Sequence, residues 1–201
     1  MNKAAFDWDA VWNRKGREDT ELKALCGYNH VENVNIDKIA ASIISDLEVK
    51  QEDRFLDIAC GGGFLSSAIL RKAPDIIYVG TERSAVIARK HRQTLGNAVL
   101  NFSAHEAVFH DDFFSHCLCF SAFQYFPSHD YAKEVLRQML RQARRAYIGD
   151  LAIKSHDDSH LLYKQDEVVS WIMDICGHKA SIKVTEGHFY TTRFNVIVHR
   201  P

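Results

Sequence analysis

Short apolar runs alternate with longer stretches of helical periodicity along most of the chain. The runs are rich in β-branched and aromatic residues and predict strands, whereas apolar positions three and four apart predict amphipathic helices. We expect strands at residues 54–59, 76–81, 97–103, 116–123 and 146–151, and helices at 35–48, 64–73, 84–95, 128–144 and 164–177. Strands that alternate with helices form parallel sheets, so the pattern predicts a doubly wound α/β fold.

The pattern changes near the C-terminus, where residues 180–187 and 192–200 lack helical periodicity and are joined by only a few residues. Two such runs predict a β-hairpin with antiparallel strands, while helical crossovers keep the first five strands parallel. The expected sheet therefore has seven strands, mostly parallel, with a reversed last strand.

Residues 1–34 precede this pattern and do not share it. They contain Trp8, Trp12 and Tyr28, and we expect an irregular N-terminal arm or lid ahead of an α/β core at 35–201. The chain has 201 residues, of which 46% are hydrophobic, which is enough to bury one substantial core. A single domain over 1–201 is therefore predicted.

Charge and cysteine usage narrow the classes of partner and compartment. The formal net charge is -1, so no basic field marks the chain for nucleic acid or an anionic membrane. No apolar run approaches the roughly 20 residues that a membrane span needs. The 5 cysteines show no CxxC pair, which favours reduced thiols. We expect a cytoplasmic protein without nucleic-acid or membrane partners.

Residues 55–63, FLDIACGGG, form a strand that ends in glycines and turns into a helix. Such a turn places free N–H groups and the positive end of the helix dipole beside a ligand, and the missing side chains allow close approach. Glu82 lies at the end of the next strand, where an acid accepts hydrogen bonds from both ribose hydroxyls. Together these features predict a nucleotide-like cofactor.

NAD is the alternative cofactor for this turn, and its fingerprint is G-x-G-x-x-G. Gly61 and Gly63 satisfy the first two positions, but Ser66 stands where the third glycine belongs. Asp57 lies inside the first strand, where the dinucleotide pattern asks for no acid. A phosphate loop is excluded because no Gly-Lys-Ser/Thr follows.

The segment FLDIACGGG resembles the first motif of the class I S-adenosylmethionine-dependent methyltransferases, with Ala59 in place of the first glycine. YVGTERS resembles the second motif, HEA at 105–107 the acidic segment that follows, and HCLCFSAFQYF the fourth-strand segment, where His116 replaces the common aspartate. The resemblance covers most of the chain. It implies a Rossmann-like methyltransferase fold and S-adenosyl-L-methionine as cofactor, with S-adenosyl-L-homocysteine as product.

The resemblance also implies which residues hold the cofactor. Glu82 would accept the ribose hydroxyls, Glu106 would accept the adenine amino group, and Ala107 would supply backbone. The full set that it implies is Asp57, Ala59, Cys60, Gly61, Gly63, Glu82, Arg83, Glu106, Ala107 and Ser121.

Methyl transfer needs aligned donor and acceptor atoms and a site that excludes water. An acceptor of high pKa also needs a general base, whereas an ionised carboxylate or phenolate does not. In an open α/β sheet such groups lie beyond the carboxyl ends of the strands. We predict catalytic roles for His156, His160 and Tyr125 and substrate contacts for Gln124, Arg193 and Trp12.

Each of these assignments has an alternative. The two histidines are either substrate contacts or solvated loop residues, and a metal site with Asp157 and Asp158 is a weaker reading, so no metal is predicted. Arg193 either selects an anionic acceptor or is an exposed residue at a strand end. The tryptophans of the arm either close over the cofactor or anchor the arm.

The predicted function is methyl transfer to a small-molecule acceptor, with oxygen slightly favoured over nitrogen, by a monomer or homodimer. The DW-x-x-VW segment of the arm, FQYF followed by proline, and GDL after the fifth strand resemble the small-molecule branch of the family. The alternatives are a non-catalytic protein that binds the cofactor as a regulatory partner and an NAD-dependent oxidoreductase.

Overall fold

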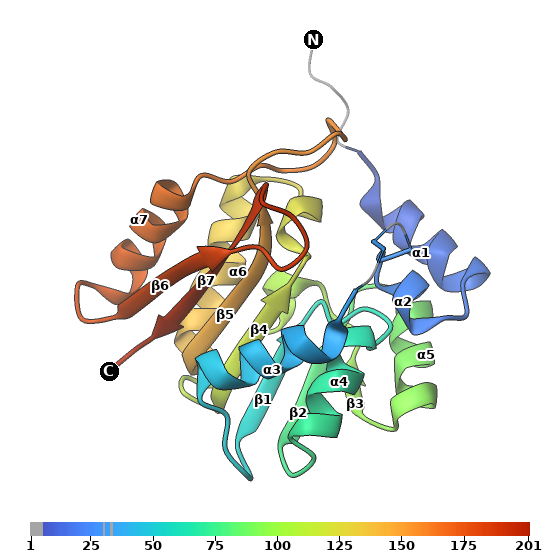
Figure 1. Ribbon diagram of the computed structural model, residues 1–201, viewed down its shortest axis with the longest axis horizontal. Coiled ribbons are helices and arrows are strands. Elements are labelled where there is room, and N and C mark those ends of the chain that lie inside the picture. Colours follow the sequence, from blue (N-terminus) through green and yellow to red (C-terminus); the bar gives the residue numbers. More distant parts are fainter. Residues whose placement is uncertain (1–5, 30, 33) are drawn as a thin grey trace.

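A computed structural model describes residues 6–29, 31–32 and 34–201, and its centre is a seven-stranded sheet with the order β3-β2-β1-β4-β5-β7-β6 (Figure 1). The strands are β1 (Arg54–Ile58), β2 (Ile77–Thr81), β3 (Ala98–Leu100), β4 (Phe114–Phe120), β5 (Ala143–Ala152), β6 (Ser181–Glu186) and β7 (Arg193–His199). The first five pair in parallel, and β7 is antiparallel to both β5 and β6. The predicted fold class, with its reversed last strand, is confirmed.

Helices cover both faces of this sheet (Figure 1). They are α3 (Ile36–Leu47), α4 (Phe64–Lys72), α5 (Ala85–Leu95), α6 (His129–Gln142) and α7 (Gln165–Cys176), and two 3-10 turns, η1 (Ala104–Glu106) and η2 (Phe123–Tyr125), lie in the loops. Apolar residues of α3 and α4 pack on one face of the sheet, and those of α6 and α7 pack on the other. Cys117 and Cys119 share the second face and are fully buried.

The ends of β3, β4 and β5 differ from the sequence prediction, because a partner strand, a backbone turn or the preceding helix sets them. β3 stops at Leu100 because its only neighbour, β2, ends at Thr81, the residue it pairs with. β4 begins at Phe114 and ends before Ser121, whose positive φ of 55° breaks the extended backbone. β5 begins at Ala143, since α6 runs into it without a loop.

The N-terminal segment is helical, so the prediction of an irregular arm is wrong for the residues described. It contains α1 (Trp8–Glu18) and the short α2 (Leu22–Leu25). Asp7 caps α1 by accepting a hydrogen bond from the Ala10 N–H at 3.0 Å. Residues 1–5, 30 and 33 of the predicted arm lie outside the described residues.

Contacts with α5 fix α1 beside the sheet. The position of Gly16 leaves no room for a side chain, since an added Cβ would lie 2.9 Å from Cγ1 of Ile87 on α5. The Ser84 hydroxyl at the start of α5 donates a hydrogen bond to Oδ1 of Asn13 at 2.8 Å. The N-terminal helices therefore stand at the carboxyl edge of β1 and β2. Within the described residues, none of the helices has both the length and the apolar character needed to cross a bilayer.

Candidate functional site

The turn between β1 and α4 adopts left-handed backbone at three positions. Ala59 and Gly61 both have φ of 57°, and Gly63, the N-cap of α4, has φ of 92°. Left-handed backbone costs an L residue about 1–2 kcal/mol, which explains the two glycines and makes Ala59 a strained exception. The N–H groups of this turn are engaged within the protein, since Gly61 donates to Glu82 and Gly63 donates to the carbonyl oxygen of Cys60.

Asp57 holds this turn from below. Its Oδ2 accepts hydrogen bonds from the hydroxyls of Ser66 at 2.8 Å and Tyr78 at 2.9 Å, which join β1 to α4 and β2. Burial raises the pKa of the Asp57 carboxyl to about 6, and the two hydroxyls lower it. Asp57 is therefore ionised at neutral pH and stabilises the local structure of the turn.

Glu82 follows β2 and faces the same turn. Its Oε2 accepts the Gly61 N–H at 3.1 Å, and its Oε1 accepts the Ser84 N–H at 2.7 Å. The residue is 8% exposed and lines the cavity described below. Each carboxylate oxygen can accept two hydrogen bonds, so each retains one acceptor position for a ligand donor. This carboxylate suits a ligand with two adjacent hydroxyls.

A cavity of about 940 Å³, including its open mouth, lies above these groups. Its floor consists of Asp57, Ala59, Cys60, Gly61 and Glu82, and its cover consists of Trp8, Trp12, Leu25, Cys26 and Tyr28. The cover contacts the glycine turn directly, since a Cβ added at Gly62 would lie 2.4 Å from Cβ of Leu25.

The Cys60 thiol is buried, and its Sγ lies 3.4 Å from Nδ1 of His91. Burial raises the pKa of the thiol well above its usual range, with smaller contributions from Asp57 and Glu82. A thiol held in its neutral form is not a nucleophile. Cys60 therefore lines the cavity floor with a neutral thiol.

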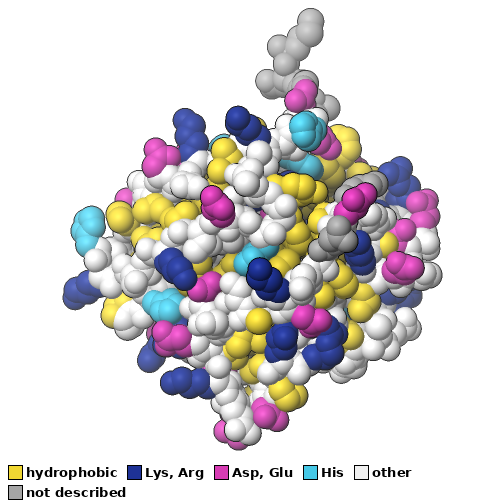
Figure 2. All heavy atoms as spheres, viewed as in Figure 1, with side chains coloured by type: hydrophobic (Ala, Val, Ile, Leu, Met, Phe, Trp, Pro, Cys, Tyr) yellow, Lys and Arg dark blue, Asp and Glu magenta, His cyan; other side chains and the backbone are white. Residues whose placement is uncertain are grey.

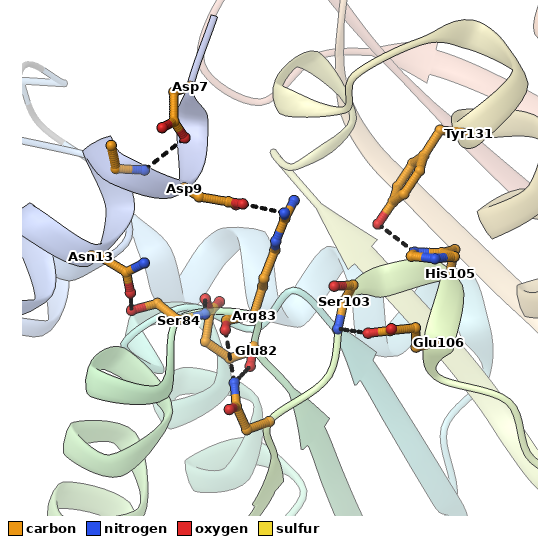
Figure 3. Close-up of polar contacts among 12 residues, drawn as sticks. Asp7, Asp9, Asn13, Glu82, Arg83, Ser84, Ser103, His105, Glu106 and Tyr131 are labelled. Carbon is orange, nitrogen blue, oxygen red and sulfur yellow. Dashed lines mark hydrogen bonds and ion pairs between the residues drawn. The ribbon is translucent and has the colours of Figure 1, made fainter.

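The loop after β3 forms the end of the cavity near Glu82, and Figure 3 shows its polar contacts. The Glu106 carboxylate is exposed and accepts the Ser103 N–H at 3.0 Å as part of a capping box. Phe102, Ala104 and Tyr131 line the cavity here, whereas Glu106 and the buried Ala107 are outside its lining. The adenine contact assigned to Glu106 and Ala107 stays a prediction.

Arg83 reaches across the cavity mouth to α1. Its guanidinium forms an ion pair with Asp9 (Figure 3). Both side chains are about half exposed, so this pair contributes little to stability. Its effect is to place Arg83, which lines the cavity, between the Glu82 loop and the N-terminal helices.

An aromatic cluster closes the opposite end of the cavity. The ring of Trp8 stacks on His160 with centroids 5.2 Å apart, and the ring of Tyr125 meets Trp8 edge-on at 4.6 Å. Trp12 contacts Tyr125 at 5.1 Å. Of the predicted catalytic and substrate residues, the structure thus brings Tyr125, His160 and Trp12 together.

His156 lies apart from this cluster. Its side chain is exposed, as are those of Asp157 and Asp158, while Nδ1 of His160 lies 2.6 Å from the Ser155 hydroxyl. Across the described part of the chain, no group of three histidine, cysteine or acidic residues is arranged to hold a metal ion. The two loop histidines therefore occupy different environments although they are four residues apart.

We expect His160→Ala to weaken binding of S-adenosylhomocysteine, the product that the sequence resemblance implies, about 3- to 10-fold, because the aromatic contact between His160 and Trp8 that holds α1 closed is worth about 0.5–1.5 kcal/mol. His156→Ala is the matched control and should change the affinity less than twofold, since its ring is exposed. Isothermal titration measures both. Equal losses in the two variants would show that the cluster does not hold the cover.

Two polar residues behind the cluster belong to a buried network. Gln124 is 1% exposed and lies outside the cavity lining, and its Nε2 donates to the carbonyl oxygen of Ser121 at 2.9 Å. Arg193 donates from Nη1 to the carbonyl oxygen of Asp150 at 3.2 Å. Its side chain is 12% exposed, so the reading of an exposed arginine at a strand end is wrong.

Some residues of the site escaped the sequence analysis. Leu25 and Cys26 lie on the glycine turn, and burial raises the pKa of the Cys26 thiol to about 11. The spacing of Trp8, Val11 and Trp12 is a helical signal that would have predicted α1 and hence this cover. No sequence signal marks Leu25 or Cys26 themselves.

Two comparisons of the sequence with known proteins find similarity to methyltransferases. Residues 55–146 match the family model described as a methyltransferase domain. The ribosomal RNA small subunit methyltransferase C of Hamiltonella defensa subsp. Acyrthosiphon pisum (strain 5AT) is 25% identical over 93 residues. The match covers 46% of this chain and 27% of that protein, so the chain spans little more than a quarter of the relative.

Solved structures share the fold over nearly the whole chain. Magnesium protoporphyrin IX methyltransferase from Synechocystis PCC 6803, solved with bound S-adenosylmethionine, superposes with a TM-score of 0.66 at 14% identity, covering 97% of this chain and 92% of that one. A chain from the complex between the Haloferax volcanii Trm112 methyltransferase activator and the putative methyltransferase gives a TM-score of 0.69 at 14% identity, with 98% and 100% covered.

The reversed β7, the glycine turn and the acid after β2 belong to the Rossmann-like methyltransferase fold that the solved structures share. The chain thus shares a methyltransferase-domain match over residues 55–146, and the fold of nearly its whole length, with S-adenosylmethionine-dependent methyltransferases. The observed site fits the group, because each oxygen of the Glu82 carboxylate accepts one backbone N–H and keeps an acceptor position for a ribose hydroxyl. The match to the methyltransferase-domain model disfavours the alternative of an NAD-dependent oxidoreductase.

Cofactor affinity should depend on pH through Glu82. Burial raises the pKa of its carboxyl to about 7 in the free protein, and the Ser84 and Gly61 N–H groups lower it. Because burial raises this pKa, ionisation of Glu82 costs free energy of folding as the pH rises through about 7. Ribose hydroxyls that donate to the carboxylate favour its ionised form, so binding of the ligand offsets this cost. S-adenosylhomocysteine affinity should be constant well above pH 7 and fall towards tenfold per pH unit below it.

Titration calorimetry at several pH values between 5.5 and 8.5 tests this dependence. Glu82→Gln is the matched control, because an amide of the same shape does not titrate and should bind with a weak affinity that is flat with pH. A wild-type affinity that is equally flat would contradict the role given to Glu82.

Proposed function

We propose that the chain is an S-adenosylmethionine-dependent methyltransferase that transfers the methyl group to a small-molecule acceptor, at oxygen in preference to nitrogen. The cover of the cavity supports this proposal most. In it α1, α2 and Tyr28 lie over the glycine turn, and aromatic rings close one end of the cavity. A cavity closed in this way suits a small, flat, largely apolar acceptor and excludes bulk water.

S-adenosylmethionine supplies a methyl group on a positively charged sulfur, which is a strong electrophile. The residues of the chain have to orient the cofactor. We propose that Glu82 binds the ribose hydroxyls and that the backbone of Gly61 and Gly63 lies against the cofactor. The acceptor would enter from the side of Tyr125, beyond the carboxyl ends of β4 and β5, where open α/β sheets bind their substrates.

The surface charge agrees with a small acceptor. Figure 2 shows Lys and Arg interspersed with Asp and Glu over the face in view, and the formal net charge of the chain is -1. Binding to a polynucleotide draws most of its affinity from a field of positive charge. RNA, the substrate named for the curated relative, is therefore the less favoured acceptor.

Transfer of tritium from methyl-labelled S-adenosylmethionine tests the proposal. The purified protein is incubated with mixtures of phenols, aliphatic alcohols, amines and carboxylic acids and, separately, with total RNA. Label in a small molecule, absent with Glu82→Ala, is the expected result. Label in RNA alone would overturn the small-molecule proposal, and cofactor binding without transfer to either would favour a non-catalytic partner.

We also propose that the chain acts as a single domain, as a monomer or homodimer, in the cytoplasm. Support for one domain comes from the seven strands, which all join one sheet, and from α1, which packs on α5. The free thiols of Cys26, Cys60, Cys117, Cys119 and Cys176 support a reducing compartment. Sedimentation of the purified protein tests the oligomeric state.

A further inference from the structure

Ser121 and Asp150 lie side by side at the acceptor end of the cavity. Ser121 follows β4 and lines the cavity, and Asp150 lies in β5, the neighbouring strand. The pairing of Phe120 with Gly149 brings the two residues together, and the Ser121 hydroxyl donates to Oδ2 of Asp150 at 2.7 Å. The strand order places them across β1 from Glu82, on the side away from the ribose.

The hydrogen bonds of the Ser121 hydroxyl leave one position open. A hydroxyl has one donor and two acceptor positions. The donor is used by Asp150, and one acceptor position takes Nε2 of Gln124 at 3.2 Å. The carbonyl oxygen of Ser121 can only accept a hydrogen bond, so the group of Gln124 that faces it must be the NH2 group. The Tyr28 hydroxyl lies beside Ser121 in the cavity, and the remaining position of Oγ can accept a proton donor from Tyr28 or from a ligand.

Both residues are held in strained backbone. Ser121 has φ of 55° and Asp150 has φ of 60°, in the left-handed region that non-glycine residues avoid. The Ser121 N–H donates to Gly149 and the Asp150 N–H donates to Oδ1 of Asn195, both at 2.9 Å. Strain of this kind persists where surrounding contacts fix it and concentrates at functional sites.

Arg193 lies beside Asp150 and balances the charge of its carboxylate. Arg193 donates to its carbonyl oxygen, and Nη1 lies 3.9 Å from Oδ2. Asp150 is 3% exposed, and its Oδ1 has no hydrogen-bond partner among the described residues. Burial raises the pKa of its carboxyl to about 6, while Arg193 and Ser121 lower it, so it is ionised at neutral pH. With Arg193 engaged here, the pair is neutral and offers no free cation to an anionic acceptor.

We propose that Ser121 and Asp150 form a hydroxyl–carboxylate relay that takes the proton of the acceptor, which is therefore a neutral hydroxyl or amine and not an ionised carboxylate. The acceptor's lone pair forms the new bond to the methyl carbon, and the sulfur keeps the electron pair of the broken bond. The acceptor proton passes to Oγ of Ser121 as the Ser121 proton passes to Oδ2 of Asp150, which later returns it to water. Ser121 is the catalytic residue, and Asp150 and Arg193 are positioning residues.

The relay rests on the proposed methyltransferase function, and a binding experiment separates the two. Sinefungin carries a C–NH3+ group where S-adenosylmethionine carries its S–CH3 group. Both are cations at that position, but only the ammonium has N–H donors for Oγ of Ser121. Titration calorimetry compares sinefungin, S-adenosylmethionine and S-adenosylhomocysteine on the wild type, Asp150→Asn and Ser121→Gly. Glycine retains the positive φ of position 121 without strain.

The wild type should prefer sinefungin over S-adenosylmethionine by about tenfold or more, as expected for a charge-assisted hydrogen bond. Both variants should reduce this preference to less than about threefold. Their S-adenosylhomocysteine affinity should stay within about threefold of the wild type, because that ligand places no donor at Ser121. Asp157→Asn, which removes an exposed carboxylate, is the matched control and should keep the preference.

Two results would overturn the relay: a wild-type protein without the preference, or variants that retain it in full. Failure of the wild type to bind S-adenosylhomocysteine would overturn the proposed function and the relay with it. In the labelling assay, transfer to a carboxylic acid but to no alcohol, phenol or amine would contradict the relay alone.

Discussion

Glu82→Ala should weaken S-adenosylhomocysteine binding by about 100-fold or more, because two hydrogen bonds to a charged group, worth about 1.5–3 kcal/mol each, are lost. The Gly61 and Ser84 N–H groups lose their partner as well, so the turn itself becomes less ordered. Isothermal titration at pH 8 gives the affinity, and thermal unfolding shows whether the variant is folded.

Glu106→Ala is the informative comparison for this variant. Its carboxylate is exposed and hydrogen-bonded to Ser103, and a change in affinity of less than about threefold would show that this arrangement persists when the cofactor binds. A loss of about tenfold, the worth of one hydrogen bond to a charged group, would show that Glu106 turns to the adenine when the cofactor binds. Unchanged binding in Glu82→Ala would contradict the ribose assignment outright.

Gly62→Ala should weaken S-adenosylhomocysteine binding at least tenfold while the core stays folded. The new methyl group would lie 2.4 Å from Cβ and 3.1 Å from Cδ1 of Leu25, so α2 has to move off the glycine turn. Displacement of α2 opens the cavity to water and removes part of its apolar wall. Calorimetry gives the affinity, and hydrogen exchange of residues 22–28 should rise in the variant.

Gly96→Ala separates this effect from general loss of stability. Gly96 has a positive φ of 72° and nothing within 4 Å of an added Cβ, so alanine there costs about 1–2 kcal/mol of folding free energy through backbone strain alone. The cofactor affinity should not change. If Gly62→Ala also binds normally, contact between α2 and the glycine turn does not shape the site.

Local signals in the sequence predict much of the fold. Ser84 and Gly96 mark the two ends of α5, and the structure confirms both caps, with the Ser84 hydroxyl accepting the Ile87 N–H. The hairpin after α7 follows from two runs without helical period. These features depend on neighbours along the chain, which is why periodicity and turn residues reveal them.

Features set by contacts across the sheet do not follow from the sequence in this way. The length of β3 depends on where β2 ends, and the left-handed backbone of Ser121 and Asp150 is fixed by Gly149 and Asn195. No local pattern predicts a positive φ at serine or aspartate, because tertiary contacts impose it.

The residues of the candidate site also differ in whether the sequence predicts them. The glycine turn and Glu82 are contiguous motifs and could be read directly. His156 and His160 look alike in a polar loop, and only the path of that loop brings one of them against Trp8. Arg193 was predicted to select an anion or to be exposed, but its position beside Asp150 depends on the pairing of β5 with β7.

A crystal structure with S-adenosylhomocysteine bound tests the central claim most directly. We predict both ribose hydroxyls within hydrogen-bond distance of the Glu82 carboxylate, with the ligand sulfur on the Ser121 side of the cavity and α1 and α2 closed over it. A ligand bound elsewhere, or one whose ribose makes no contact with Glu82, would contradict the account.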